Sequence, residues 1–474
     1  MKHIYKKFIN AALVVSGLFA TSCNDFLNEI PKGEKIPQTW EDYNAFMRNK
    51  NLSYFENEQI LFLMGDYFRS PSALNSSELT RANYLFLEDV DRTAINTGDY
   101  MAFYSAYEMM FYWNLIIEEG MNATQATDQQ RRMLVAQARV LRAMTYHYIA
   151  NYHADQYCEA TLNTLSVPLV TSASVEAPSP QATLQQLYDF MVSDLLAAIP
   201  DLPDRGETIV HPTKAAGYGM LARVYLSMGR YADAGKAASD AIKENGNLYD
   251  WVKFYNDDKE RIEDTSTFNV ATSVNPEIDN PENYVYHASS SGYWAGISSG
   301  SLTLSLERAA RFEPGDIRLI GKWRYYKTAA GIEYYRGLYA NEPNYGGIRA
   351  AEMYYILAEC QARDGKISEA MESVNKVRRT RFLPEYYTPL QAVDKTEAIN
   401  KIIDDKANEF IQTQIPFCDY RRLNKEGIYT RTLTKTIDGV TYTLSPDSHM
   451  WIFPYPAKVL QNPGNNPIVQ TVNK

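Results

Sequence analysis

The residue types that carry most enzyme chemistry are present, but their spacing matches no familiar catalytic or metal site. The six His residues are scattered, and His147 and His153 lie six positions apart. No H-E-x-x-H spacing occurs, so the sequence predicts no metal site. A P-loop and a Gly-x-Gly-x-x-Gly motif are also absent, and the stretch GISSG from Gly296 to Gly300 has no recognisable partner groups for a serine nucleophile. We therefore expect no metal and no cofactor.

Acidic side chains leave one reaction open. Glycoside hydrolysis needs two carboxylates, and these need only meet in space, so any sequence spacing is compatible with it. Glu119, Glu359 and Asp364 fall in predicted helices, where solvated helix faces account for them.

Aromatic side chains are the most distinctive feature of the composition. The chain holds 36 Tyr against 18 Phe and 6 Trp. A Tyr ring has an apolar face and a polar tip, which suits wet binding surfaces as well as cores. Tyr293 and Trp294 lie among Gly and Ser, and Trp323 and Tyr325 lie in the stretch WRYYK. The net charge of −10 argues against a nucleic-acid binder, which would show a basic stripe.

The N-terminus has the pattern of a secretory signal. Three Lys residues within the first seven positions precede an apolar run from Phe8 to Ala20. This run is too short for an ordinary membrane-spanning helix. Thr21-Ser22-Cys23 resembles a bacterial lipobox, which implies that Cys23 carries a diacylglycerol and that residues 1–22 are a lipoprotein signal peptide. The alternative is a secreted protein with an incidental cysteine.

The remaining cysteines give no disulfide framework. Cys158, Cys360 and Cys418 are odd in number, and none are paired by C-x-x-C spacing. Cys360 lies in an apolar helical stretch and is expected to be buried. One bridge, between Cys158 and Cys418, stays open.

Helical periodicity runs through the first half of the chain. One helix is expected from Asp99 to Gly120, and a second begins near Asp128. Thr183 is expected to cap a third helix, which ends at Pro200. The positions expected to face inward are Leu134, Ala138, Leu141, Tyr148, Tyr152, Leu187, Met191, Leu195 and Ile199.

An internal repeat is the strongest pattern. Residues 221–241 (LARVYLSMGRYADAGKAASDA) align without gaps with residues 357–377 (LAECQARDGKISEAMESVNKV). Each block predicts a helix, a turn at Gly229 or Gly365, and a second helix. This is tetratricopeptide-like, and such hairpins need neighbours to bury their faces. We therefore expect an all-α, mainly helical fold, with about four hairpins forming a curved scaffold.

A long irregular insertion separates the two blocks, at about 246–347. Segments 320–327 and 332–339 flank Ala329-Ala330-Gly331 and predict a β-hairpin. A helix is expected across 394–413, and a short hairpin around Asp438-Gly439. The density of aromatic residues in the insertion argues against disorder.

Several stretches, taken in chain order, are similar to those of one known family. CNDFLNEIP is similar to C-x-D-F-L-D-x-x-P, and ARVLRAMTYHYIANYH to A-x-x-L-R-A-x-x-Y-x-x-L. HPTKAAGYGMLARVYLSMGRYADA, RFEPGDIRL, RAAEMYYILAECQARDGKISEAMESVNKVRRTR and WIFPYPAKVLQNP each match a further family element. Together, behind the lipobox, they resemble the SusD/RagB family, the outer-membrane nutrient-binding lipoproteins of Bacteroidetes. The chain departs from the family pattern at Ile317, where Pro is usual, and at Asp405-Lys406, where Glu-Arg is usual.

The resemblance implies a fold and a function. It implies a single domain over 23–474, with tetratricopeptide-like hairpins as a frame and the insertion on the binding side. It implies lipid anchoring at the cell surface in the outer membrane, and a SusC-like TonB-dependent transporter as partner. The implied ligand is a glycan, or alternatively a peptide, and no catalysis is implied.

A glycan site needs exposed aromatic rings beside planar polar groups, because sugar C–H faces lie against rings and hydroxyls need donors and acceptors. Trp294 with Tyr293 is the first candidate, the alternative being a Trp that plugs the scaffold. Trp323 and Tyr325 share one face of the predicted hairpin, where packing against the helices is the alternative.

The stretch MGDYFRSPSALNSS supplies a second set of candidates. The family often places a binding loop after its first helix, near an Asp that matches Asp66. Asp66, Tyr67 and Arg69 are therefore candidate ligand contacts, and Arg69 has the fork geometry for hydroxyls or a carboxylate. A surface turn with a helix cap is the alternative.

Three functional hypotheses follow. The first is a lipid-anchored binding protein that passes an oligosaccharide to a transporter. The second is a lipid-anchored glycoside hydrolase, which requires two facing carboxylates. The third is a protein-interaction scaffold that uses the concave face of the solenoid.

Overall fold

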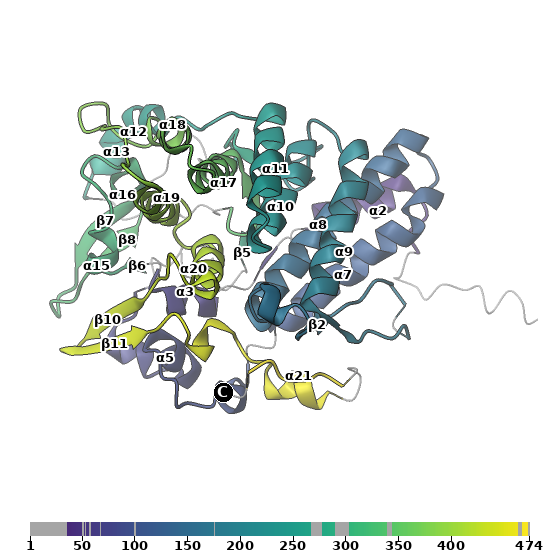
Figure 1. Ribbon diagram of the computed structural model, residues 1–474, viewed down its shortest axis with the longest axis horizontal. Coiled ribbons are helices and arrows are strands. Elements are labelled where there is room, and N and C mark those ends of the chain that lie inside the picture. Colours follow the sequence, from purple (N-terminus) through teal and green to yellow (C-terminus); the bar gives the residue numbers. More distant parts are fainter. Residues whose placement is uncertain are drawn as a thin grey trace, which may run out of the picture.

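Helices dominate the structure and pack as a continuous array (Figure 1). The computed structural model describes residues 36–49, 52, 54–55, 58–66, 68–98, 101–174, 176–266, 277–289, 303–338, 344–462 and 467–472. Within these ranges no helix has the length and apolar character needed to cross a membrane. Each helix of the array contacts the next, in the order α7 (Met101–Glu119), α8 (Asp128–His153), α9 (Leu184–Ala198), α10 (Lys214–Ser227), α11 (Tyr231–Glu244), α17 (Ala350–Arg363), α18 (Ile367–Arg378), α19 (Lys395–Glu409) and α20 (Ile415–Glu426).

Side-chain caps set the starts of three array helices. Thr127, Thr183 and Thr213 each accept a hydrogen bond from the backbone N–H three positions on. This bond satisfies one of the N–H groups that a helix start leaves unpaired. At Thr127 and Thr183 a Gln side chain returns the bond and completes a capping box. The predicted helix start near Asp128 and the predicted cap at Thr183 are therefore confirmed.

Both copies of the repeat form the predicted helical hairpin. Gly229 follows α10 with a φ of +71°, and Gly365 follows α17 with a φ of +82°. This left-handed conformation costs other residues about 1–2 kcal/mol, and glycine adopts it freely. The two copies also pack together through α11 and α17, where a Cβ on Gly235 would lie 3.0 Å from the Cβ of Cys360. This close approach joins the array across the insertion.

The helix faces predicted to point inward form part of the core. Every residue of the two predicted stripes is buried: Leu134, Ala138, Leu141, Tyr148, Tyr152, Leu187, Met191, Leu195 and Ile199. Cys360 is buried as expected. Cys158, Cys360 and Cys418 are all free, so the bridge left open between Cys158 and Cys418 is not formed.

The segment between α11 and α17 holds short elements. Its helices are α12 (Trp251–Asp257), α13 (Lys259–Glu263), α15 (Leu306–Ala309) and α16 (Ile317–Ile320), and its strands are β4 (Asn283–Val285), β5 (Ala288–Ser289), β6 (Thr303–Leu304), β7 (Trp323–Lys327) and β8 (Glu333–Gly337). The predicted hairpin is confirmed, because β7 pairs antiparallel with β8 in the register Tyr325 to Tyr335. β6 adds to the other edge of β8, so the sheet order is β6-β8-β7.

Segments before and after the array complete the fold. The N-terminal part contains α2 (Trp40–Arg48), β1 (Tyr54–Phe55), α3 (Glu58–Met64), α4 (Pro71–Leu74), α5 (Glu78–Tyr84) and α6 (Arg92–Ile95). Within the array, β2 (Leu165–Pro168) and β3 (Gln181–Thr183) lie between α8 and α9, and β9 (Ile348–Arg349) directly precedes α17. The C-terminal part contains β10 (Leu433–Ile437), β11 (Val440–Leu444) and α21 (Ala457–Gln461). β10 and β11 form the hairpin predicted around Asp438-Gly439, both of which have positive φ.

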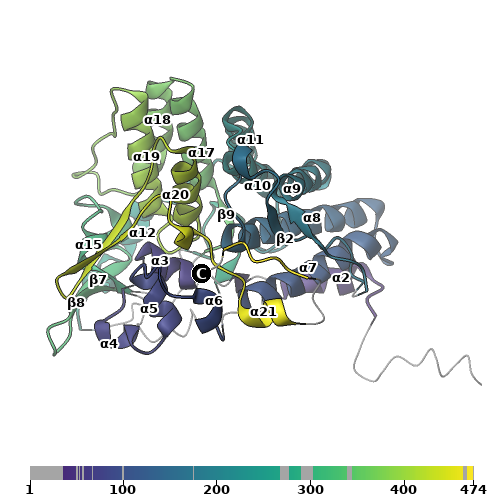
Figure 2. The same cartoon turned by 60° about the horizontal axis from the view of Figure 1, so that its bottom comes forward.

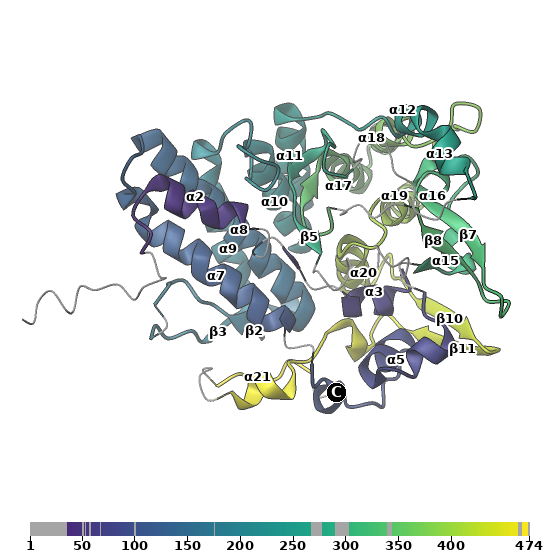
Figure 3. The same cartoon turned by 180° about the vertical axis from the view of Figure 1, so that it is seen from behind.

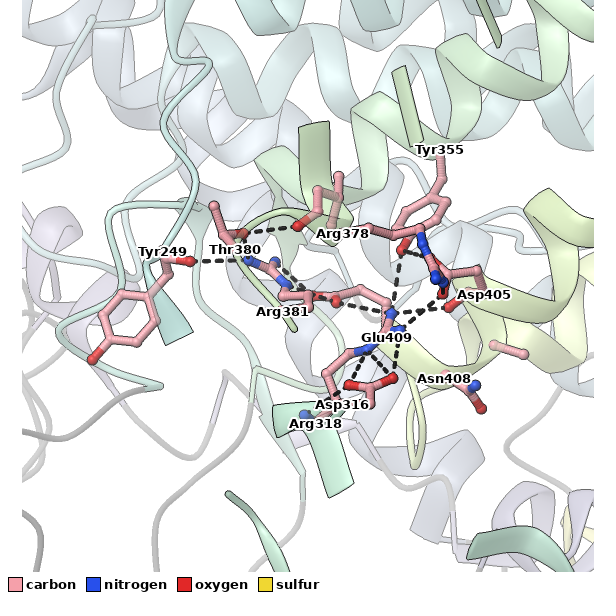
Figure 4. A network of polar contacts seen from close by, with 12 residues as sticks. Tyr249, Asp316, Arg318, Tyr355, Arg378, Thr380, Arg381, Asp405, Asn408 and Glu409 are labelled. Atoms are coloured by element: carbon pink, nitrogen blue, oxygen red, sulfur yellow. Dashed lines mark hydrogen bonds and ion pairs between the residues drawn. The ribbon is translucent and has the colours of Figure 1, made fainter. Parts of the chain in front are cut away.

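A buried charge network ties the insertion to the array (Figure 4). Arg318, at the start of α16, bonds Asp316 at 2.7 Å and Asp405 of α19 at 2.8 Å. Arg378 of α18 reaches the same Asp405 oxygen at 2.8 Å, and Tyr355 of α17 donates to the other oxygen at 2.6 Å. Four elements therefore meet on one carboxylate. Because these groups are buried, removing one partner would leave an uncompensated charge.

Candidate ligand-binding site

A cavity of about 240 Å³ lies where segments distant in sequence converge. Its walls come from the end of α3, the turn from β6 into α15, strand β8, and strand β10. These elements gather at one end of the molecule in all three overall views (Figure 2 and Figure 3). We call this cavity the α3–β10 pocket.

Asp66 fixes the segment that follows α3. Its carboxylate accepts a hydrogen bond from Nε of Arg308 at 2.8 Å, and both side chains are almost fully buried. Its backbone oxygen accepts from the Gln412 amide at 3.2 Å. The structure thus places Asp66 beneath the pocket rather than in it. Neither a ligand contact nor a surface turn, the two roles considered from the sequence, describes this buried ion pair.

Phe68 is aligned by the strand beside it. Its N–H donates to the Thr303 carbonyl at 2.9 Å, and its own carbonyl accepts from the Thr303 hydroxyl at 2.9 Å. Its ring stacks on Tyr334 of β8, with centroids 5.8 Å apart and planes 23° from parallel. The half-buried ring of Phe68 therefore lines the pocket as a held aromatic surface.

Lys435 holds the β10 wall against α3 and α5. Its ammonium donates to the carbonyls of Phe62, Leu63 and Tyr84 at 2.6, 2.9 and 2.8 Å. It also lies 4.2 Å from the centroid of the Tyr84 ring. Burial lowers the pKa of Lys435 well below its usual range. Gly65 makes room for this side chain, because a Cβ there would lie 2.9 Å from the Lys435 Cε.

Two charged side chains line the pocket without a bonded partner. Glu307 and Arg311 are exposed, and neither has a hydrogen bond or ion pair within the described ranges. Thr434 and Thr436 also line the pocket, at exposed positions of β10, and the Thr436 hydroxyl lies 3.1 Å from that of Thr441. An aromatic ring, a carboxylate, a guanidinium and two hydroxyls are thus presented to one cavity.

The β7–β8 hairpin places its two predicted ligand residues differently. Trp323 is buried, with 7% of its surface exposed, which agrees with the packing alternative. Tyr325 is 48% exposed, and its hydroxyl donates to Glu333 at 2.7 Å. Glu333 lines the pocket and also accepts from Lys327 at 3.0 Å. Tyr325 therefore adjoins the pocket through Glu333, whose pKa these two bonds lower.

Arg69 packs at the side of the pocket wall. Its guanidinium lies 4.9 Å from the centroid of the Phe62 ring and 3.8 Å from the Glu58 carboxylate. The other predicted residues, Tyr67, Tyr293, Trp294 and the lipidation residue Cys23, lie outside the described residues.

The sequence reasoning missed the residues that make this pocket polar. Glu307 lies in the four-residue helix α15, Arg311 in the turn that follows it and Thr434 in strand β10. No local pattern marks any of the three as a ligand contact. Phe68 is adjacent to the predicted Asp66–Arg69 stretch, so its neighbourhood was found although the residue was not. Only the approach of segments hundreds of residues apart reveals the set.

The buried carboxylates elsewhere are occupied by cations. Glu359, expected on a solvated helix face, is instead buried and bonded by Arg422 and Arg363. Glu359 is therefore part of a buried ion cluster inside the hairpin array, and the two arginines hold its pKa at about 2. Among the residues described here, no group of three His, Cys, Asp or Glu could hold a metal ion.

Comparison with known families and structures matches most of the chain. A family described as "Starch-binding associating with outer membrane" matches residues 26–226, and the SusD family matches residues 215–470. No significant match is found among curated protein sequences.

Solved structures share the fold at low identity. A putative sugar binding protein from Bacteroides vulgatus is 17% identical, covers 92% of this chain and 99% of its own, and has a TM-score of 0.69. A SusD superfamily protein from Bacteroides fragilis is 18% identical, covers 91% of this chain and 100% of its own, and has a TM-score of 0.67. Surface glycan-binding protein A from Bacteroides uniformis is 18% identical, covers 92% of this chain and 100% of its own, and has a TM-score of 0.63. With the family match extending over more than half its length, this chain belongs to the SusD/RagB-like family.

Proposed function

We propose that this protein is a non-catalytic cell-surface lipoprotein that binds a glycan and delivers it to a SusC-like TonB-dependent transporter in the outer membrane. The binding site is the α3–β10 pocket together with the adjoining β7–β8 hairpin. The family description as starch-binding and associated with the outer membrane supports the ligand class and the location. The names of two structural neighbours, a putative sugar binding protein and a surface glycan-binding protein, point the same way.

The combination of groups in the pocket carries the proposal. A sugar offers an apolar C–H face and a ring of hydroxyls, and the Phe68 ring with Glu307 and Arg311 offers a surface for each. Few polar groups placed around an apolar surface are typical of small-ligand sites. Glu333 is held as a carboxylate by two donors, which suits hydrogen bonding to hydroxyls better than proton donation in hydrolysis.

A peptide is the second candidate ligand. The pocket presents one unpaired carboxylate and one unpaired guanidinium, Glu307 and Arg311, which would also complement the two charges of a short peptide. A peptide digest therefore belongs in the same binding experiment as the polysaccharides.

Titration calorimetry of the purified chain with a polysaccharide panel and a peptide digest tests the site. We expect one polysaccharide to bind, and Phe68→Ala to weaken binding at least tenfold. Phe111→Ala is the matched control, because Phe111 is an exposed ring on α7 outside the pocket. Trp294→Ala tests the candidate from the sequence in parallel. Equal binding by Phe68→Ala and wild type would move the site elsewhere, and binding of peptides alone would select the second candidate.

The proposed anchor has a separate test. Two or more acyl chains hold a protein stably on a membrane, whereas a chain without them has no such anchor. Cys23→Ser is expected to move the protein from the membrane fraction to the soluble fraction, and Cys158→Ser is expected to leave it in the membrane fraction. Membrane retention of Cys23→Ser would contradict lipidation at this residue.

A further inference from the structure

A second cavity, of about 400 Å³, shares no lining residue with the α3–β10 pocket. It lies between the chain that leaves α8, the last turns of α20 and the C-terminal segment, which runs beneath α20 in yellow in Figure 1. Its volume falls within the range of small-molecule sites. We call it the α8–α20 cavity.

A buried cation without a carboxylate partner lines this cavity. Arg421 is 3% exposed and donates three hydrogen bonds, all to neutral oxygens of Asn151 and Ala154. A guanidinium carries five N–H groups, so two remain. Its neighbour Arg422 is, by contrast, bonded by the carboxylates of Glu359 and Asp419. Burial lowers the pKa of Arg421, and the Asp155 carboxylate opposes this shift only in part.

Asn424 and Lys425 also line the cavity, together with the carboxylates Asp155 and Asp447. The Oδ1 atom of Asn424 accepts from the Arg431 N–H at 2.6 Å, while its buried Nδ2 has no hydrogen-bond partner in the described part of the chain. Lys425 donates to both oxygens of Asp155, at 3.1 and 3.0 Å, which occupies the nearest carboxylate. A buried N–H group without an acceptor is costly, so this wall favours a ligand that supplies one.

The remaining wall is mixed, with the polar residues Asp447, Ser448, His449 and Thr471 beside apolar ones. Trp451, Ile452 and Val472 line it, which gives the cavity a surface for carbon as well as for charge. An inorganic anion would leave this surface uncovered, whereas an organic acid covers it with its carbon skeleton.

We propose that the α8–α20 cavity binds a small organic molecule through a carboxylate group, which accepts hydrogen bonds from Arg421 and Asn424. A carboxylate matches the planar fork of a guanidinium and supplies the missing counter-charge. Lys425, on the rim, adds attraction at longer range. The site is independent of the glycan pocket, since its residues and chemistry are different.

Glucuronate is the probe, and glucose is its uncharged counterpart. In titration calorimetry with the full-length protein, we expect glucuronate to bind and glucose to give no signal attributable to this cavity. Asn424→Asp keeps the oxygen that Arg431 bonds but replaces the donor with a negative charge. It is expected to weaken glucuronate binding at least tenfold, and Lys425→Gln is expected to weaken it by a smaller factor.

Asn400→Asp is the matched control. Asn400 also accepts a hydrogen bond from Arg431, at 2.9 Å, but lies on α19 outside the cavity. The isosteric change is the same, so unchanged glucuronate binding in this variant would assign the loss in Asn424→Asp to the cavity. Equal responses to glucose and glucuronate, no glucuronate binding by wild type, or unaltered binding by Asn424→Asp would each overturn the proposal. Melting temperatures of the variants confirm that each one folds.

Discussion

Lys435 shows how one side chain can hold a wall of the α3–β10 pocket. Its ammonium donates to three carbonyls at the ends of α3 and α5, where helix geometry leaves carbonyls without intrahelical donors. The Phe62 carbonyl also accepts from the Gly65 N–H, so the Leu63 and Tyr84 carbonyls depend most on Lys435. In Lys435→Met the side chain has similar length but no donor. Each buried polar group left unsatisfied costs about 1–3 kcal/mol, so we expect a loss of about 3 kcal/mol or more in urea unfolding.

Lys236→Met is the control for this prediction. Lys236 is a helix residue with 78% of its side chain exposed, and it pairs only with Asp240 at the surface. Its unfolding midpoint is expected to match that of the wild type. An unchanged midpoint in Lys435→Met would mean that water satisfies the three carbonyls equally well.

Three buried histidines make stability depend on pH. Burial lowers the pKa of His147 to about 3, of His153 to about 4 and of His287 to about 3, against about 6.5 in an unfolded chain. The unfolded state therefore binds more protons below pH 6.5. The stability from these neutral rings is complete above pH 6.5 and falls as the pH drops toward 4, by up to about 1.4 kcal/mol per pH unit for each ring.

His153→Gln isolates one of these contributions. Nδ1 of His153 bonds the Phe453 carbonyl at 2.9 Å, and because that oxygen can only accept, the ring nitrogen carries the proton. Gln keeps a donor but does not titrate. Urea unfolding at pH 7.5, 6 and 5 is expected to show a smaller pH slope in the variant, because one of the titrating rings is removed. Parallel slopes in the two proteins would contradict the neutral buried ring.

At the scale of elements, the glycines in the two turns of the repeat differ from an ordinary loop glycine in their backbone conformation. Gly229 and Gly365 have positive φ and nothing within 4 Å of an added Cβ, so substitution there costs backbone strain alone. Gly229→Ala and Gly365→Ala are each expected to lower stability by about 1–2 kcal/mol. Gly98→Ala is the control, because Gly98 has the same open surroundings without positive φ. Thermal unfolding that ranks Gly98→Ala with the other two would refute the strain argument.

Elements with local signals could be predicted from the sequence, and those that depend on distant contacts could not. Thr183 caps α9 by a hydrogen bond to a residue three positions away, and Gly229 ends the α10 hairpin helix by its own positive φ. Each signal therefore lies within a few residues. Asp66 was a candidate ligand contact, but Arg308, 242 positions away, encloses it in an ion pair. Glu359 was expected at the surface, and Arg422, 63 positions away, makes its burial tolerable.

The stretches that carry the family resemblance build the frame, and of their residues only Arg311 lines the pocket. Asp316 and Arg318 lie in RFEPGDIRL, Arg378 lies in the long stretch that ends in RRTR, and all three belong to the network around Asp405 (Figure 4). The family was therefore recognisable from the residues that join insertion and array. Of the two unpaired charged residues of the pocket, Glu307 lies outside these stretches and Arg311 lies at the start of one, so the sequence indicated the fold more sharply than the ligand.

At the scale of the whole molecule, the pocket joins parts of the chain that are far apart. Its walls come from residues 64–65, 68, 84, 305–308, 311, 333 and 433–437. The charge network couples the insertion to the array behind them. If these parts unfold together, a ligand bound at the pocket stabilises the entire chain. If they unfold separately, the ligand stabilises only some of them.

Calorimetric melting with the glycan identified by titration distinguishes these cases. A ligand at 100 times its Kd adds about 2.7 kcal/mol to the folded state. We expect one cooperative transition whose Tm rises with glycan concentration, because the buried Asp405 and Asp66 ion pairs must break together. The rise is expected to persist in Phe111→Ala and to fall by about half or more in Phe68→Ala at the same glycan concentration, in line with binding at least tenfold weaker. Two transitions, of which only one moves, would show instead that the insertion folds apart from the helical array and that the pocket belongs to the insertion alone.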